Sequence, residues 1–144
     1  MIKSIRHILQ VKGFDTWFVR PETTVFEALK QMSDREIGAL LVMEGEKLVG
    51  IFSERDYARK VILKGKSSKD TPVSEIMTTH VFTLHPEQTL QEAMELMTEK
   101  HIRHLPVVEG EKVLGMVSIG DVVRNIIHKQ KKLISEMEDK ILSS

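Results

Sequence analysis

PETTVFEALKQMSDREIGALLVMEGEKLVGIFSERDYARKVI, at residues 21–62, returns later in the chain as PEQTLQEAMELMTEKHIRHLPVVEGEKVLGMVSIGDVVRNII, at residues 86–127. The two stretches align without a gap, at a constant offset of 65 residues. Chance does not produce such a match, so the chain contains one structural unit twice. Identical residues at equivalent positions include Pro21/Pro86, Thr24/Thr89, Glu27/Glu92, Ala28/Ala93, Met32/Met97, Ile37/Ile102, Gly50/Gly115, Ser53/Ser118, Asp56/Asp121 and Arg59/Arg124.

Each copy predicts a helix that begins at a capping box. Thr24 with Glu27, and Thr89 with Glu92, place a hydroxyl and a carboxylate where they can bond to backbone N–H groups of the first turn. Apolar residues then recur at helical spacing, which gives each helix one buried face. These apolar residues are Val25, Ala28, Leu29 and Met32 in the first copy, and Leu90, Ala93, Met94 and Met97 in the second.

A β-hairpin follows each of these helices. The apolar runs 39–43 and 105–108 lead through Glu-Gly-Glu-Lys into second apolar runs at 48–52 and 113–117. The runs are continuous, so we expect strands covered on both faces. Short strands at 17–19 and 81–84 precede the capping boxes, and a second helix starts near Ser53 or Ser118. The unit is therefore β-α-β-β-α, and the fold class is α/β (alpha+beta).

The rest of the chain divides around the two copies. We predict an N-terminal helix in residues 1–16, the first repeat at 17–66, the second at 67–127, and a C-terminal helix at 128–144. The stretch KGKSSKDTP at 64–72 is typical of a linker. One repeat alone is too small to bury its own faces, so the two should pack together and leave paired clefts. The tail keeps an apolar stripe at Leu133, Ile134, Met137 and Ile141, which needs a cover.

Composition excludes several classes of function. Lys+Arg and Asp+Glu both total 21, and this zero net charge argues against a broad grip on nucleic acid. The chain has no cysteine, which removes disulfides and thiolate chemistry and fits the cytoplasm. Charges interrupt every apolar run, so we expect neither a secretory signal nor a membrane span.

No catalytic motif is visible, and we do not expect an enzyme. The sequence has no phosphate-binding Gly-rich loop, no HExxH and no nucleophile elbow. His101 and His104 stand three residues apart, but no second histidine pair or matched carboxylate accompanies them. We therefore predict no catalytic residue and no metal site.

The repeated Ser-x-x-Asp has two compatible interpretations. Ser53 with Asp56, and Ser118 with Asp121, stand where a strand ends and a helix begins. Such a pair caps a helix start. An aspartate at the mouth of a cleft can also accept hydrogen bonds from both hydroxyls of a ribose.

Both copies resemble CBS domains, which occur in tandem as a Bateman module. The resemblance spans about residues 17–127 and rests on the Pro-x-x-Thr helix entry, the apolar hairpin and the Gly-h-h-Ser-x-x-Asp ending, where h is hydrophobic. It implies a pseudo-twofold pair of repeats that binds adenosine derivatives in the central clefts. It also implies that Ser53, Asp56, Ser118 and Asp121 face the ribose.

The resemblance further implies basic residues that meet phosphates on the strand after the first helix. Arg103 and His104 match these positions in the second repeat, whereas Gly38 and Ala39 occupy them in the first. The two halves are therefore not equivalent. Arg55, whose counterpart is Gly120, is either a further phosphate contact or a solvated surface residue.

The chain is similar to stand-alone two-CBS proteins that bind AMP or NAD-type ligands. We therefore expect a regulatory sensor for an adenine nucleotide (AMP, ADP, ATP or NAD) that acts on a separate, unidentified target protein and forms a homodimer. The alternative is a ligand-free module for protein–protein interaction, in which the terminal helices do the binding.

Overall fold

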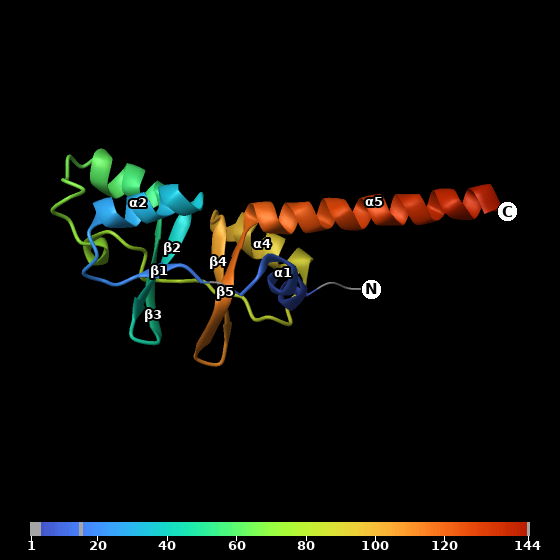
Figure 1. The fold of residues 1–144 in the computed structure, drawn as a ribbon, viewed down its shortest axis with the longest axis horizontal. Coiled ribbons are helices and arrows are strands. Elements are labelled where there is room, and N and C mark those ends of the chain that lie inside the picture. The colour runs from blue at the N-terminus through green and yellow to red at the C-terminus, as the bar shows by residue number, and fades with distance from the viewer. Residues whose placement is uncertain (1–3, 15, 144) are drawn as a thin grey trace.

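The computed structural model describes residues 4–14 and 16–143. Two small β-hairpins lie side by side with helices along one end, and a long helix projects from the body (Figure 1). This mixed α and β architecture confirms the predicted fold class. In chain order, the elements are α1 (Ile5–Lys12), β1 (Phe18–Val19), α2 (Val25–Arg35), β2 (Ala39–Glu44), β3 (Lys47–Ser53), α3 (Glu54–Tyr57), the π-helix η1 (Ala58–Ile62), the 3-10 helix η2 (Val73–Glu75), α4 (Leu90–Lys100), β4 (His104–Glu109), β5 (Lys112–Ser118) and α5 (Ile119–Ser143).

The predicted hairpins form, β2 with β3 and β4 with β5, both antiparallel. Their turns contain Gly45 and Gly110 at φ 62° and 64°, a backbone conformation that costs glycine little. The capping boxes also form in part as expected. Thr89 and Glu92 bond reciprocally, and Thr24 accepts from the backbone N–H of Glu27.

The strand predicted at 81–84 is wrong, because only Leu84 forms an isolated parallel bridge, with Val107. In the first repeat, β1 pairs with β2, and the N–H of Leu41 donates to the carbonyl of Trp17. Pro106 stands at the position equivalent to Leu41 and has no N–H to donate. The parallel ladder of the second repeat therefore ends after one bridge.

Each repeat completes its core with residues that precede the aligned stretch of the other repeat, 21–62 or 86–127. Val73 and Ile76 lie in the core of the first repeat, and Ile5, Ile8 and Leu9 lie in the core of the second. The apolar face of α1 is therefore buried within the chain. This face needs no second copy to cover it.

The repeated glycines Gly50 and Gly115 make room for this exchange of segments between the two repeats. A Cβ at Gly50 would lie 2.6 Å from the sulfur of Met77, and one at Gly115 would lie 2.9 Å from a methyl group of Leu9. Both distances are shorter than van der Waals contact. The absent side chain is therefore the space into which the exchanged segment packs.

The helices that follow the hairpins differ between the repeats. The first repeat has the short α3 and then η1, whereas α5 runs for 25 residues without a break. The boundary that we predicted at residue 128 thus lies inside one continuous helix. Among the helices described, none is long and apolar enough to cross a membrane.

Candidate functional site

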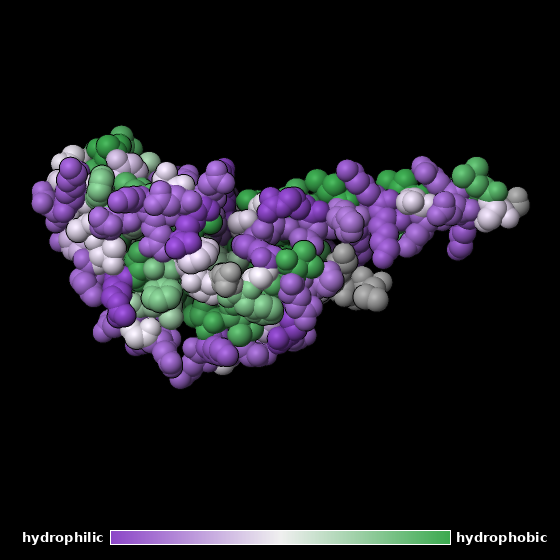
Figure 2. Space-filling model, viewed as in Figure 1, coloured by the Kyte–Doolittle hydropathy of each residue, from purple (hydrophilic) through white to green (hydrophobic). Residues whose placement is uncertain are grey.

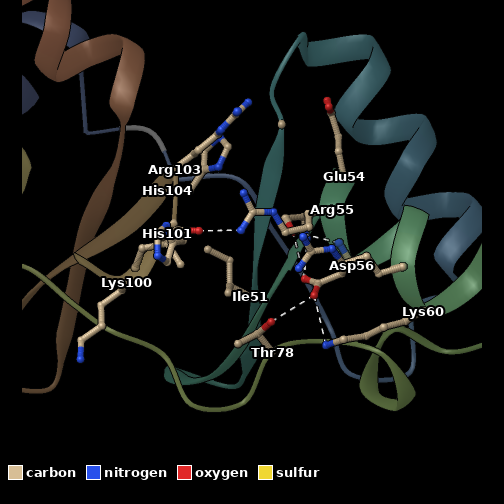
Figure 3. A pocket seen from close by; sticks show the side chains of 14 residues that line it. Ile51, Glu54, Arg55, Asp56, Lys60, Thr78, Lys100, His101, Arg103 and His104 are labelled. Atoms are coloured by element: carbon tan, nitrogen blue, oxygen red, sulfur yellow. Dashed lines mark hydrogen bonds and ion pairs between the residues drawn. The ribbon is translucent and has the colours of Figure 1, made fainter. Parts of the chain in front are cut away.

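The main candidate site is a cavity of about 520 Å³ between the two repeats, a size typical of small-molecule pockets. The first repeat supplies the end of β3 and the start of the following helix, and the second supplies the segment from α4 into β4 (Figure 3). The residues that line it are Gly38, Ile51, Ser53, Glu54, Arg55, Asp56, Arg59, Lys60, Thr78, Lys100, His101, Ile102, Arg103 and His104.

Asp56 is the most constrained polar group of this cavity. One carboxylate oxygen accepts from the backbone N–H and the hydroxyl of Ser53, at 3.0 and 3.1 Å. The other accepts from the hydroxyl of Thr78 and lies 3.1 Å from the ammonium of Lys60. The side chain is only 8% exposed. Asp56 therefore caps α3, and its second oxygen faces the cavity with donors that a ligand hydroxyl could join or replace.

Positive charge dominates the cavity wall, although the whole chain is neutral. Five Lys or Arg residues line it against two carboxylates, and the cations are Arg55, Arg59, Lys60, Lys100 and Arg103. Arg55 is tied across the cleft to the carbonyl oxygen of His101. The exposed side chain of Arg103 makes no hydrogen bond or ion pair with any residue that the structure describes. Arg103 is therefore available to an incoming anion.

His104 contributes a neutral donor or acceptor rather than a charge. Burial lowers the pKa of its imidazole, and the charge of Lys12 lowers it further, against an opposing effect of Asp121. The ring lies beside Gly38, where an added Cβ would be 3.1 Å from it. The glycine in the first repeat therefore provides the room that the imidazole from the second repeat occupies.

The equivalent residues of the second repeat, Ser118 and Asp121, do not line this cavity. Asp121 also forms a helix cap with Ser118. One of its oxygens lies 2.7 Å from the ammonium of Lys12, and the other lies 2.7 Å from the guanidinium of Arg124. Burial alone would raise the pKa of Asp121, but the hydrogen bonds from Lys12 and Ser118 outweigh it, and the pKa is lowered.

A comparison of equivalent positions explains why the cations collect in one cleft. Lys60 of the first repeat corresponds to Asn125, and His101 of the second corresponds to Glu36. Arg35, the counterpart of Lys100, stacks its guanidinium 3.4 Å from the centre of the Trp17 ring. Together with the Arg55/Gly120 and Arg103/Gly38 differences, these substitutions collect the cations in the cavity at Asp56.

The comparisons with known proteins agree with this architecture. The CBS domain family matches residues 11–63 and 73–128. The chain belongs to the CBS-domain family. Over 121 residues it is 44% identical to the mitochondrial CBS domain-containing protein CBSX3 of Arabidopsis thaliana, covering 81% of this chain but only 59% of that relative.

Two solved structures of CBS domains are similar to this fold over most of the chain. The CBS domain structure NE2398 superposes with a TM-score of 0.85 at 46% identity, covering 88% of this chain and 99% of that one. The CBS domain pair of protein MJ0100, in complex with 5′-methylthioadenosine and S-adenosyl-L-methionine, superposes with a TM-score of 0.80 at 27% identity, covering 90% and 99%.

The cavity of the present chain brings together five of the seven predicted site residues, namely Ser53, Arg55, Asp56, Arg103 and His104. Sequence reasoning missed Thr78, Lys60 and Lys12. Lys60 carried a local signal, because it stands four residues after Asp56. Thr78 and Lys12 reach the carboxylates only through the exchange of segments between repeats, which no local pattern reveals.

The histidines of the CBS pair do not gather into a metal site. Within residues 4–14 and 16–143, no group of three or more His, Cys, Asp or Glu side chains could hold a metal ion. His101 ends α4 in the left-handed conformation, at φ 56°.

Proposed function

We propose that the cleft between the CBS repeats binds one adenine nucleotide per chain and that the protein is a non-catalytic regulatory module. The observation that carries this is that one cavity contains both a buried carboxylate of the first repeat, Asp56, and a guanidinium of the second repeat, Arg103. This guanidinium makes no hydrogen bond or ion pair with the described residues. Asp56 provides acceptors suited to ribose hydroxyls. Arg103 provides a planar fork of donors suited to phosphate oxygens.

The charge of the cavity supports a phosphorylated ligand over a plain nucleoside. Five cations against two carboxylates leave an excess of positive charge at the wall, and phosphate groups of AMP, ADP, ATP or NAD would neutralise it. The MJ0100 CBS pair, whose structure contains two adenosine derivatives, supports the adenosine part. NAD and the adenosine phosphates share this chemistry, so the class rather than one member is proposed.

The surroundings of Asp121 support a single site. Asp121 already pairs with Lys12 and Arg124, both at 2.7 Å. Asp56 has one such contact, with Lys60 at 3.1 Å, so a ribose would displace fewer cations there, and Gly38 offers no side chain to a phosphate. We therefore expect one nucleotide per chain.

Regulation follows from the position of the ligand between the two repeats. A nucleotide that contacts both repeats favours whichever arrangement it binds more tightly. The output would be read by a separate target protein, and we infer that the module acts as a homodimer. The absence of cysteine is compatible with a reducing compartment such as the cytoplasm.

Calorimetric titration with AMP, ADP, ATP, NAD, S-adenosylmethionine and adenosine tests the proposal. We expect at least one nucleotide to bind with a stoichiometry near one and more tightly than adenosine. A hundredfold excess over Kd should stabilise the fold by about 2.7 kcal/mol, visible as a rise in Tm. No heat and no rise in Tm with any ligand at millimolar concentration would overturn it and favour a ligand-free interaction module.

A further inference from the structure

The outer part of α5 is an isolated helix with one apolar side. From His128 to Ser143, every residue is exposed, and the helix projects away from both repeats (Figure 1). Leu133, Ile134 and Met137 are each 55–56% exposed. Figure 2 shows apolar side chains along one edge of this helix and charged ones elsewhere. A single helix of this length is marginally stable in water, so a packed partner is expected.

The spacing of the apolar side fits a helix pair. One row of residues along α5 advances at alternating steps of four and three, and its members are Val123, Ile127, Gln130, Ile134, Met137 and Ile141. All of them except Gln130 are apolar. This is the heptad spacing that keeps one seam facing a second helix. The seam is therefore continuous from the body of the protein to the tip of the helix.

Charge along the projecting helix is divided between its two halves. Residues 128–135 contain Lys129, Lys131 and Lys132 and no acidic residue, whereas residues 136–143 contain Glu136, Glu138 and Asp139 against the single Lys140. Two such helices side by side in parallel would place basic half against basic half. An antiparallel pair places each basic half against an acidic half, and this complementarity identifies the partner as another copy of the same helix.

We propose that the exposed seam of α5 pairs antiparallel with α5 of a second copy. The register that centres the pair sets Ile134 against Met137 of the second copy and Gln130 against Ile141 of the second copy. It also sets Lys131, beside the seam, near Glu138 of the second copy, and twofold symmetry repeats this contact. Sixteen residues of overlap give a shared seam of about 24 Å, at the usual rise of 1.5 Å per residue.

The inference rests on the proposed homodimer but not on nucleotide binding. It assigns the surface and the direction of the pairing. The overlap ends near His128, where each helix leaves its own body, so the two nucleotide cavities stay outside the seam.

Charge reversal in the full chain tests the direction. Lys131→Glu turns both symmetric contacts with Glu138 from attractive to repulsive and should weaken the dimer about five- to thirtyfold in sedimentation equilibrium. Glu138→Lys should weaken it similarly, and the double variant should recover the affinity of the unmodified chain. Lys132→Glu makes the same charge change on the outer face of the helix and is the matched control, with an expected change of at most about twofold.

Cross-linking gives an independent readout, since the chain has no cysteine of its own. A mixture of Gln130→Cys and Ile141→Cys chains should form a mixed disulfide dimer, and Gln130→Cys alone should not. Efficient disulfide formation by Gln130→Cys alone would indicate a parallel pair and overturn the proposal.

Other outcomes separate this inference from the proposed function. A monomer in the unmodified chain at tens of micromolar overturns both the homodimer and the pairing. A dimer indifferent to Lys131→Glu and to Ile134→Asp overturns the pairing alone. Cross-linking together with a failure to bind any nucleotide overturns the proposed ligand and leaves the pairing standing.

Discussion

Replacing Arg103 with alanine separates phosphate recognition from recognition of the nucleoside. The side chain of Arg103 is exposed and makes no hydrogen bond or ion pair with the described part of the chain. Its loss should therefore change the free energy of unfolding by less than about 0.5 kcal/mol. A charge-assisted hydrogen bond contributes about 1.5–3 kcal/mol, and exposure to solvent places this one at the lower end. We expect AMP to bind about tenfold more weakly.

The assay is calorimetric titration of unmodified and Arg103→Ala protein with AMP and with adenosine, at one salt concentration. Adenosine has no phosphate, so its affinity should stay within a factor of about two. Arg20 is an exposed arginine outside the cavity, so Arg20→Ala is the matched control and should leave the affinity for both ligands unchanged. Equal weakening of adenosine and AMP by Arg103→Ala would refute the placement of the phosphate.

Asp56→Asn should fail in a different way. Asp56 accepts from Ser53 and Thr78 and is 8% exposed, so its replacement affects both the cap of α3 and the cavity. We expect a stability loss of about 1 kcal/mol and weaker binding of adenosine and AMP alike. Reduced stability with unchanged affinity would mean that Asp56 caps the helix and does not touch the ribose.

Three further predictions concern the ion pair of Lys12 with Asp121, the pH dependence that His104 causes, and the packing at Gly50. Lys12→Ala should destabilise the fold by about 0.5–1 kcal/mol at pH 7, discounted because Lys12 is 42% exposed. The pKa of Asp121 is lowered on folding, so this carboxylate contributes to the free energy of unfolding above about pH 4, and the contribution is lost as the pH falls. Because Lys12 helps to lower this pKa, Lys12→Ala should make the loss of stability in acid smaller, as measured by urea titrations at several pH values. The pKa of His104 is also lowered on folding, so stability should fall as pH drops from about 7 to 5, and His104→Gln should flatten that slope in the same assay. Gly50→Ala should cost about 1–3 kcal/mol in thermal unfolding, because its Cβ would lie 2.6 Å from a methionine sulfur. Gly120→Ala, in a helix and facing a flexible arginine end 3.2 Å away, should be neutral or stabilising, and a cost like that of Gly50→Ala would contradict the packing argument.

The sequence was sufficient for the features that are local or repeated. Helix starts at Thr24 and Thr89 depend on side chains within one turn, and the hairpins depend on apolar runs around one glycine. The strand at 81–84 failed because its pairing depends on a donor more than twenty residues away. That donor position is occupied by Pro106, and single-segment patterns do not show which residue will face which.

The candidate site was predictable where the Ser-x-x-Asp motif or the CBS resemblance supplied its residues. The Ser-x-x-Asp pairs located Asp56 and Asp121, but the two carboxylates have the same local sequence signal and different partners. Thr78 reaches Asp56 and Lys12 reaches Asp121 because the segments before the repeats exchange places. The different surroundings of the two carboxylates are thus a tertiary property, and no capping or periodicity rule predicts them.

One hydrogen bond joins the proposed ligand site to the proposed interface. The N–H of Ile119, the first residue of α5, donates to the carbonyl oxygen of Arg103 at 2.8 Å. A phosphate that draws Arg103 inward therefore acts on the backbone group that fixes the start of the helix forming the seam. Any resulting coupling must be reciprocal, because linkage requires AMP to shift the dimer dissociation constant by the same factor by which dimerisation shifts the affinity for AMP. Sedimentation with and without saturating AMP gives the first factor, and AMP titrations of the unmodified dimer and of the weakened Lys131→Glu chain give the second. Two equal factors different from one would establish that nucleotide binding and dimerisation are coupled, whereas a factor of one in both measurements would show that the nucleotide does not act on the dimer.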